Sequence, residues 1–185
     1  EDVYLKGEFR TKIQSTLVPA ILGVGKPFTR DDEANGFTTA SVVNVMAQMY
    51  LENPELHKTS IFQKIPNSIE IAINSFDRYR AGNVYNFYPP YILENGQTTR
   101  RPSDLTLATF WLGFTNLPND SDSTSSILTS LALASKILNT NYKVSEEALS
   151  EFSKSLDLNR SAMYYNKSEG RVNTGAFMTW LKDEK

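Results

Sequence analysis

The sequence has no cysteine among its 185 residues and a single histidine, His57. The lack of cysteine excludes disulfides, thiolate catalysis and cysteine-based zinc sites. A serine-histidine-aspartate or histidine-rich zinc mechanism would have only His57 to recruit, and no G-x-S-x-G elbow accompanies it. The glycine-rich stretch 23–26 lacks both the spacing and the Ser or Thr that a Walker loop needs. The sequence therefore predicts no metal site and no cofactor.

Basic stripes and long apolar runs are also missing. The formal net charge is -2 and both signs are spread along the chain, so no nucleic-acid partner is predicted. The apolar run 127–138 is interrupted by Ser and Thr and is too short to cross a hydrocarbon layer, so no membrane span is predicted.

What the chain has is enough apolar material for a sizeable core. With 40% hydrophobic residues, we expect one soluble domain over 1–185. The compartment stays open, a secreted or extracytoplasmic location included, because many such proteins also lack cysteine.

Apolar residues recur at helical spacing in several segments. Proline and glycine mark the ends of these segments. Pro66 suits the first turn of a helix, and Gly82 suits a left-handed residue that ends one. No strand pattern is strong. We therefore expect an all-α fold of antiparallel αα-hairpins packed as a small helical bundle. The predicted helices are 8–22, 37–52, 66–82, 103–117, 122–138 as the central helix, 145–156 and a turn over 175–183, with loops at 23–37 and 83–101.

Two carboxylates, Asp120 and Asp122, stand two residues apart at the start of the predicted central helix. One interpretation is structural, because Asp, Ser and Thr oxygens satisfy the free N–H groups of a helix start and a negative charge favours the helix dipole. The other is functional: one carboxyl is partly desolvated beside a like charge, which raises its pKa and suits it to general acid catalysis. The stretch lacks the Gly and the terminal Glu of an EF-hand, so calcium is not predicted.

Two aromatic stretches accompany this turn. The loop 85–91 contains Tyr85, Asn86 and Tyr88. The tyrosine rings either line a ligand cleft or fill the end of a helical bundle, and Asn86 supplies directional hydrogen bonds. Arg78 lies just before the loop and is a candidate partner for an anionic ligand or for a nearby carboxylate. The stretch 174–180 ends in Thr179 and Trp180 and suits either a binding surface or a segment docked on the core.

The order of these stretches resembles helical proteins of the α/α-toroid type, which include terpenoid cyclases and prenyltransferase-like repeat proteins. In class II terpenoid cyclases a DxDD-Thr motif at the inner end of a helix supplies the acid that protonates a double bond. Asp120 and Asp122 match its first two carboxylates, and Ser123 stands where its last Asp would be. The resemblance implies a partial toroid, a smaller bundle, or a homo-oligomer that completes the ring.

Three functions follow from these residues. The leading hypothesis is a ligand-binding helical domain with an Asp/aromatic pocket for a small polar, carbohydrate-like or amphipathic molecule. The alternative is an enzyme, a hydrolase or a cyclase, that uses Asp120 or Asp122 for general acid/base chemistry on a glycoside, ester or polyene. The second alternative is a structural or interaction protein in which each of these stretches is core or cap. The candidate catalytic residues are Asp120 and Asp122, and the candidate ligand-binding residues are Tyr85, Asn86, Tyr88, Arg78, Thr179 and Trp180.

Overall fold

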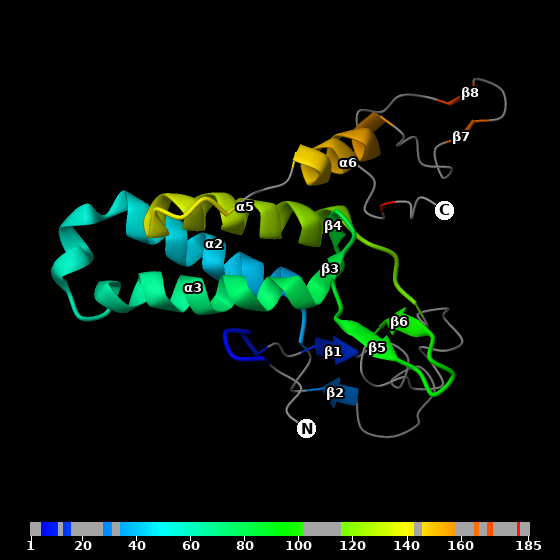
Figure 1. Cartoon of the computed structure of the whole chain (residues 1–185), viewed down its shortest axis with the longest axis horizontal. Helices are drawn as coiled ribbons and strands as arrows, with labels where there is room; N and C mark the ends of the chain where they lie inside the picture. Colours follow the sequence, from blue (N-terminus) through cyan, green and yellow to red (C-terminus); the bar gives the residue numbers. More distant parts are fainter. Residues whose placement is uncertain are drawn as a thin grey trace.

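The structure is a computed structural model of the whole chain (Figure 1). It describes residues 5–10, 13–15, 28–30, 34–101, 116–142, 146–157, 165–166, 170–171 and 181.

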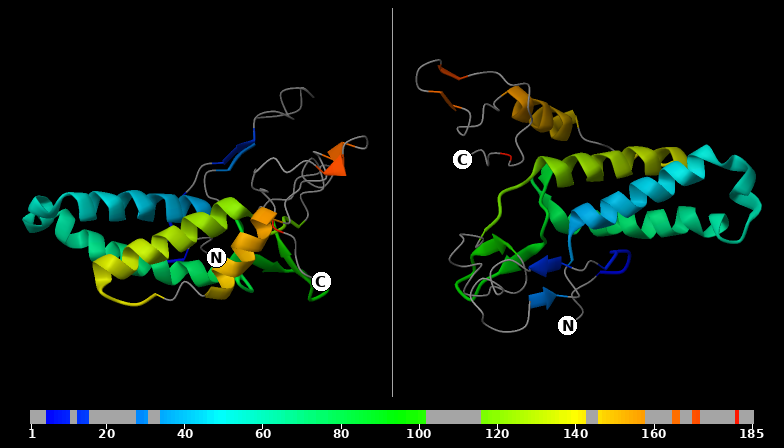
Figure 2. Two further views of the ribbon diagram at one scale, coloured as in Figure 1. Left: turned by 90° about the horizontal axis from the view of Figure 1, so that it is seen from above. Right: turned by 180° about the vertical axis from the view of Figure 1, so that it is seen from behind.

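Three helices lie side by side and form the main body, as Figures 1 and 2 show from three directions. They are α2 (Gly36–Glu52), α3 (Ile65–Ser75) and α5 (Ser121–Leu138). The short helices η1 (Pro54–Lys58) and η2 (Phe62–Lys64) join α2 to α3, so these two helices form an antiparallel hairpin. A further short helix, η3 (Phe76–Tyr79), continues α3.

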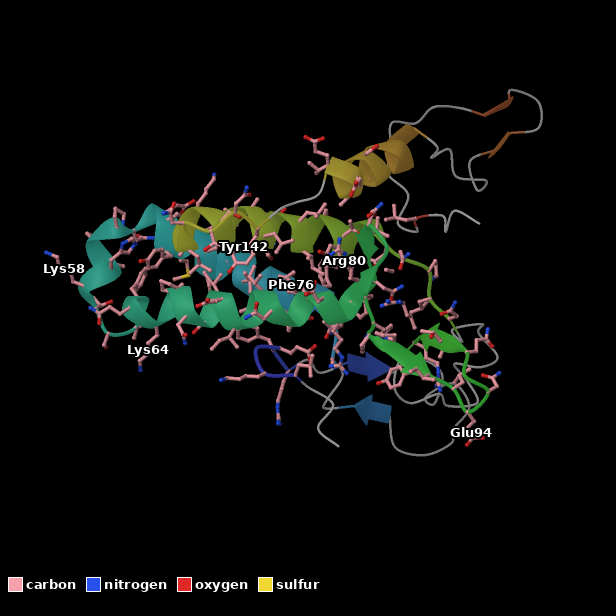
Figure 3. All side chains as sticks on the ribbon, in the orientation of Figure 1. Lys58, Lys64, Phe76, Arg80, Glu94 and Tyr142 are labelled. Atoms are coloured by element: carbon pink, nitrogen blue, oxygen red, sulfur yellow. The ribbon has the colours of Figure 1, made fainter. Side chains whose placement is uncertain are left out.

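The core lies between these three helices. Apolar side chains at helical spacing face inward from each of them, which is why the sequence folds this way locally. Phe76 lies at the centre of this body (Figure 3) and is 2% exposed. The most deeply buried apolar side chains of this core are Ala40, Val43, Ala47, Ile69, Ala72, Phe76, Tyr79, Ile127 and Ala134.

Small and polar residues line the contact between α2 and α5. The Ser130 hydroxyl is fully buried and lies 2.7 Å from Asn44 Oδ1 and 3.2 Å from the carbonyl oxygen of Ala40. The Asn44 amide in turn donates to the carbonyl of Ser126 at 3.1 Å. Because these bonds cross from one helix to the other, they fix the position of α2 along α5 as well as holding the two together.

The Ser130→Ala substitution is expected to lower the free energy of unfolding by about 1 kcal/mol, since it removes hydrogen bonds across a buried helix contact. Urea unfolding followed by circular dichroism measures this change. The matched control is Thr129→Ala, one residue earlier, whose exposed hydroxyl bonds to the carbonyl of Ser125 in its own helix. Equal effects of the two substitutions would show that the bonds between the helices contribute nothing.

The N-terminal segment 5–10 lies against α3 and η3. Gly7 has a φ of +101°, and a Cβ atom there would lie 2.4 Å from the carbonyl oxygen of Ile71, so only glycine fits. The next residue, Glu8, has a fully buried side chain that pairs with Arg78 at 3.0 Å and accepts the Tyr79 hydroxyl at 2.6 Å. This segment is thereby fixed to the helical body by both shape and charge.

The expectation of an all-α fold is wrong, because the described residues contain four antiparallel two-stranded sheets. The strands are two or three residues long. They are too short to show the alternation of apolar and polar residues that predicts a strand. Gly82 and Gly96 have φ values of +62° and +79° and turn the chain between strands, so Gly82 serves a hairpin and not the end of a helix. The paired strands are β1 (Ile13–Ser15) with β2 (Phe28–Arg30), β3 (Arg80–Ala81) with β4 (Val84–Tyr85), β5 (Pro90–Ile92) with β6 (Thr98–Arg100), and β7 (Tyr165–Asn166) with β8 (Gly170–Arg171).

Four of the seven predicted helical segments correspond to helices of the structure. The predictions over 37–52 and 122–138 correspond to α2 and α5, and the prediction over 145–156 corresponds to α6 (Glu146–Asp157). The prediction over 66–82 corresponds to α3 with η3 and is wrong at 80–82, where β3 and its turn stand. The predicted helix 8–22 is wrong where β1 stands, the predicted loop 23–37 contains β2, and the predicted loop 83–101 contains β4, β5 and β6. The predicted helix 103–117 and the turn 175–183 fall almost entirely outside the described residues. Within the described part of the chain, no helix combines the length and the apolar character needed to span a membrane.

Candidate functional site

The candidate site is built around the first turn of α5. Asp120 is the residue that caps this helix: its backbone is extended, and its Oδ1 accepts the N–H of Ser123 at 2.6 Å. The Asp120 residue is only 4% exposed, whereas Asp122 points its side chain into solvent from the same turn. The two carboxylates of the predicted pair therefore differ in environment, and Asp120 alone is buried.

The aromatic loop packs directly on this turn. The backbone N–H of Tyr85 donates to Thr124 Oγ1 at 3.0 Å, and the Thr124 hydroxyl donates back to the carbonyl of Tyr85 at 3.1 Å. The Asn86 amide donates to Asn119 Oδ1 at 3.2 Å and to the carbonyl of Leu117 at 2.9 Å. Two stretches that the sequence separates by more than thirty residues thus form one hydrogen-bonded unit.

The side chains of this loop are buried. Tyr85 and Tyr88 are each 7% exposed, and Asn86 is fully buried with its Oδ1 accepting the N–H of Tyr88 at 3.0 Å. Burial raises the pKa of the Tyr85 hydroxyl, and the nearby Arg80 offsets part of that rise. The buried side chains of this loop therefore pack behind the first turn of α5, and the hydrogen bonds of Asn86 hold the loop in place.

Arg100 ties the same loop together from the other side. Its guanidinium donates to the carbonyl oxygens of Tyr88 at 3.1 Å, Tyr79 at 3.3 Å and Arg80 at 2.7 Å. Arg78, which the sequence suggested for an anionic ligand, is instead seen in the ion pair with Glu8. Thus both arginines bond to groups of the protein itself.

Leu181, the residue that follows the predicted stretch 174–180, lies at the same turn. The backbone N–H of Leu181 donates to the carbonyl of Asn119 at 2.7 Å, and the Leu181 side chain is buried. Thr179 and Trp180 lie outside the described residues. Two of the three stretches singled out from the sequence, the Asp120 turn and the loop 85–91, therefore meet at the N-terminal end of α5, and Leu181 lies beside them.

Two buried polar atoms at this turn, Asp120 Oδ2 and Ser123 Oγ, make no hydrogen bond of good distance and angle within the described part of the structure. Ser123 is fully buried, and its hydroxyl lies close enough to the Asp120 carboxyl to lower the pKa of that carboxyl. Desolvation raises the pKa of the Asp120 carboxyl, bonds from Ser123 lower it in part, and the charge of Asp122 raises it again. A buried acceptor and a buried hydroxyl side by side suit a ligand that donates a hydrogen bond and accepts another.

Ser123 was not predicted as a site residue, although its position was visible in the sequence as the third residue after a capping Asp. Among the described residues no cluster of three metal-binding side chains occurs. Comparison with known proteins adds no assignment, since no family model, curated protein or solved structure matches the chain.

Proposed function

We propose that the chain is a ligand-binding helical domain whose recognition groups are the Asp120 carboxyl and the Ser123 hydroxyl. The observation that carries this proposal is the buried pair of Asp120 Oδ2 and Ser123 Oγ, which lie close together and make no hydrogen bond of good geometry within the described part of the structure. Burying a polar group without a hydrogen bond costs about 1 to 3 kcal/mol, so a ligand that satisfies these atoms recovers that cost on binding.

The ligand class follows from the same atoms. A carboxylate oxygen accepts, and a serine hydroxyl both donates and accepts, so the fitting group is a hydroxyl or an amine on a small polar molecule, such as a sugar or polyol. Tyr85 and Tyr88 are each 7% exposed and support the turn from behind, so the polar atoms of Asp120 and Ser123 carry the recognition in this proposal.

The binding test compares Asp120→Asn with Asp122→Asn in thermal unfolding, using a series of monosaccharides, polyols and primary amines as probes. A probe at a hundred times its Kd stabilises the folded state by about 2.7 kcal/mol. We expect such stabilisation in the native chain and in Asp122→Asn but not in Asp120→Asn. Stabilisation that survives Asp120→Asn, or its absence for every probe in the native chain, would contradict the proposal.

The pH dependence of stability gives an independent prediction for Asp120. Its folded-state pKa lies above the ordinary value because the carboxyl is desolvated. The unfolded chain therefore loses this proton first as the pH rises. The contribution of Asp120 to stability is thus complete below the unfolded-state pKa and declines as the pH rises through the folded-state pKa.

Asn caps a helix as well as Asp does, so Asp120→Asn is expected to keep α5 intact while removing that decline. Urea unfolding measured from acidic to neutral pH checks this, with Asp122→Asn as the control. The difference in unfolding free energy between Asp120→Asn and the native chain should grow in favour of the substituted chain as the pH rises. An unchanged pH profile would show that Asp120 ionises as freely in the folded chain as in the unfolded one.

A second candidate function is catalysis by Asp120 as a general acid. The favouring observation is the raised pKa, because a carboxyl that keeps its proton nearer to neutral pH is suited to donating it. The resemblance to class II cyclases would place the acid in this same motif, at Asp120 or Asp122. A hydrolytic or cyclising activity on a glycoside, ester or polyene that is lost in Asp120→Asn and kept in Asp122→Asn would favour this function over simple binding.

A further inference from the structure

The chain contains two Asn-Gly pairs in opposite environments. Asn35-Gly36 lies at the start of α2, and Asn95-Gly96 lies at the tip of the β5–β6 hairpin beside Glu94, which Figure 3 shows at the far end of that hairpin. Asn-Gly is the sequence in which an asparagine side chain is most open to attack by the following backbone nitrogen, because glycine has no Cβ to block the approach.

We propose that Asn95 is a site of spontaneous deamidation, while Asn35 is protected by the fold. In this reaction the Gly96 nitrogen loses its proton to base and attacks Asn95 Cγ. The new C–N bond forms a cyclic imide, and the carboxamide C–N bond breaks to release ammonia. Water then opens the imide at either carbonyl carbon to give aspartate or isoaspartate. One water is consumed and one ammonia is released, with no oxidant or cofactor.

The turn at Asn95 is arranged in a way that helps this attack. Asn95 and Gly96 are both exposed, so base and water reach them. The N–H of Gln97 donates to Asn95 Oδ1 at 3.0 Å, and negative charge develops on that oxygen as Cγ is attacked. The Gly96 N–H is held by the Leu93 carbonyl at 2.8 Å, a bond at an exposed turn that opens at low cost.

Asn35 differs in each of these respects. Its side chain is fully buried, and its Oδ1 accepts the N–H of Thr38 at 2.7 Å as the cap of α2. The Gly36 N–H donates to the carbonyl of Phe87 at 3.0 Å, and Gly36 is packed so closely that an added Cβ would lie 3.0 Å from the Tyr79 ring. Imide formation there requires the first turn of α2 to separate from the aromatic loop.

The product changes the hairpin tip. Either product adds a carboxylate next to Glu94 on a chain whose formal net charge is already -2. Isoaspartate also lengthens the main chain by one carbon inside the turn that pairs Ile92 with Thr98. Conversion therefore alters charge and local pairing at a hairpin tip that faces solvent.

The test incubates the folded chain in mildly alkaline buffer and measures, by peptide mass spectrometry, the conversion at Asn95 and at Asn35. A second incubation in denaturant removes the structural difference. We expect conversion at Asn95 to be at least about ten-fold faster in the folded chain, since each 1.4 kcal/mol of local opening at Asn35 slows its conversion ten-fold. In denaturant the two rates should be similar.

The control variant is Asn95→Gln, whose longer side chain closes to an imide far less readily. It should abolish the conversion at this position and leave the melting temperature unchanged. The inference is overturned if both pairs convert equally in the folded chain, or if Asn95 converts in denaturant and stays intact in the folded chain.

Discussion

Replacing Glu8 with alanine is expected to lower the free energy of unfolding by about 3 kcal/mol, since it removes the hydrogen bonds of the buried carboxylate to Arg78, to Tyr79 and to the Leu5 N–H, each contributing about 1 kcal/mol. A fully buried carboxylate is removed from Arg78 and from the Tyr79 hydroxyl, which donates to it at 2.6 Å. Its Oε2 also accepts the backbone N–H of Leu5 at 2.8 Å, so the turn at residues 5–8 loses one of its two bonds and keeps the one from the Glu8 N–H to the Leu5 carbonyl. Such a loss is a large part of the 5 to 15 kcal/mol, roughly, that a domain of this kind has.

Urea unfolding of Glu8→Ala beside Lys6→Ala measures the effect, because Lys6 stands in the same segment with an exposed side chain. The control should change the free energy by less than about 0.5 kcal/mol. Combining Glu8→Ala with Arg78→Ala should cost less than the sum of the two single changes, since both remove the same pair. An effect of Glu8→Ala as small as that of Lys6→Ala would show that the N-terminal segment contributes nothing to the stability of the helical body.

Asn86→Ala is expected to cost roughly 3 kcal/mol in the absence of any ligand, at about 1 kcal/mol for each hydrogen bond removed. The side chain bonds to Leu117, Asn119 and the N–H of Tyr88 inside a fully buried setting. If Asn86 served only to contact a ligand, the free protein would be indifferent to its loss. Stability measured without ligand therefore separates the structural role from the binding role.

The matched control is Asn74→Ala, on the exposed face of α3, for which we expect a change of less than about 0.5 kcal/mol. Asn86→Asp should cost at least as much as Asn86→Ala near neutral pH, because it buries a carboxylate and sets one of its oxygens against the Leu117 carbonyl and Asn119 Oδ1. Equal stability of Asn86→Ala and the native chain would leave its amide with no structural role and favour a role in binding.

The helices could be predicted because their signals are local. Asn35 and Asp120 are capping residues, the apolar residues of α2 and α5 recur at helical spacing, and Pro66 opens α3. The cap of α5 is Asp120, one or two residues earlier than the sequence indicated, because a carboxylate that caps and a carboxylate in the first turn look alike in a D-S-D-S sequence. The short strands gave no such signal: a three-residue strand such as β5 shows neither alternation nor length.

The environment of the site residues could not be predicted from local patterns. The burial of Asp120 and the exposure of Asp122 depend on the aromatic loop lying over one and not the other, a contact between residues 39 apart at Tyr85 and Thr124. The pairing of Arg78 with Glu8 joins residues 70 apart. The sequence does place candidate residues on helices and loops. Whether their polar atoms find hydrogen-bond partners depends on segments that are distant in the chain. The toroid architecture and the single-domain organisation stay predictions.

The contact between Leu181 and Asn119 has a consequence for folding order. The start of α5 contacts the aromatic loop and also Leu181, a residue near the C-terminus of the chain. Contacts of such sequence separation form only after the intervening chain has been closed into loops, which makes them slow to appear. The hairpin of α2 and α3 needs no distant segment, whereas the Asp120 turn is complete only when residue 181 has arrived. During synthesis, the surroundings of Asp120 would therefore be among the last parts of the molecule to form.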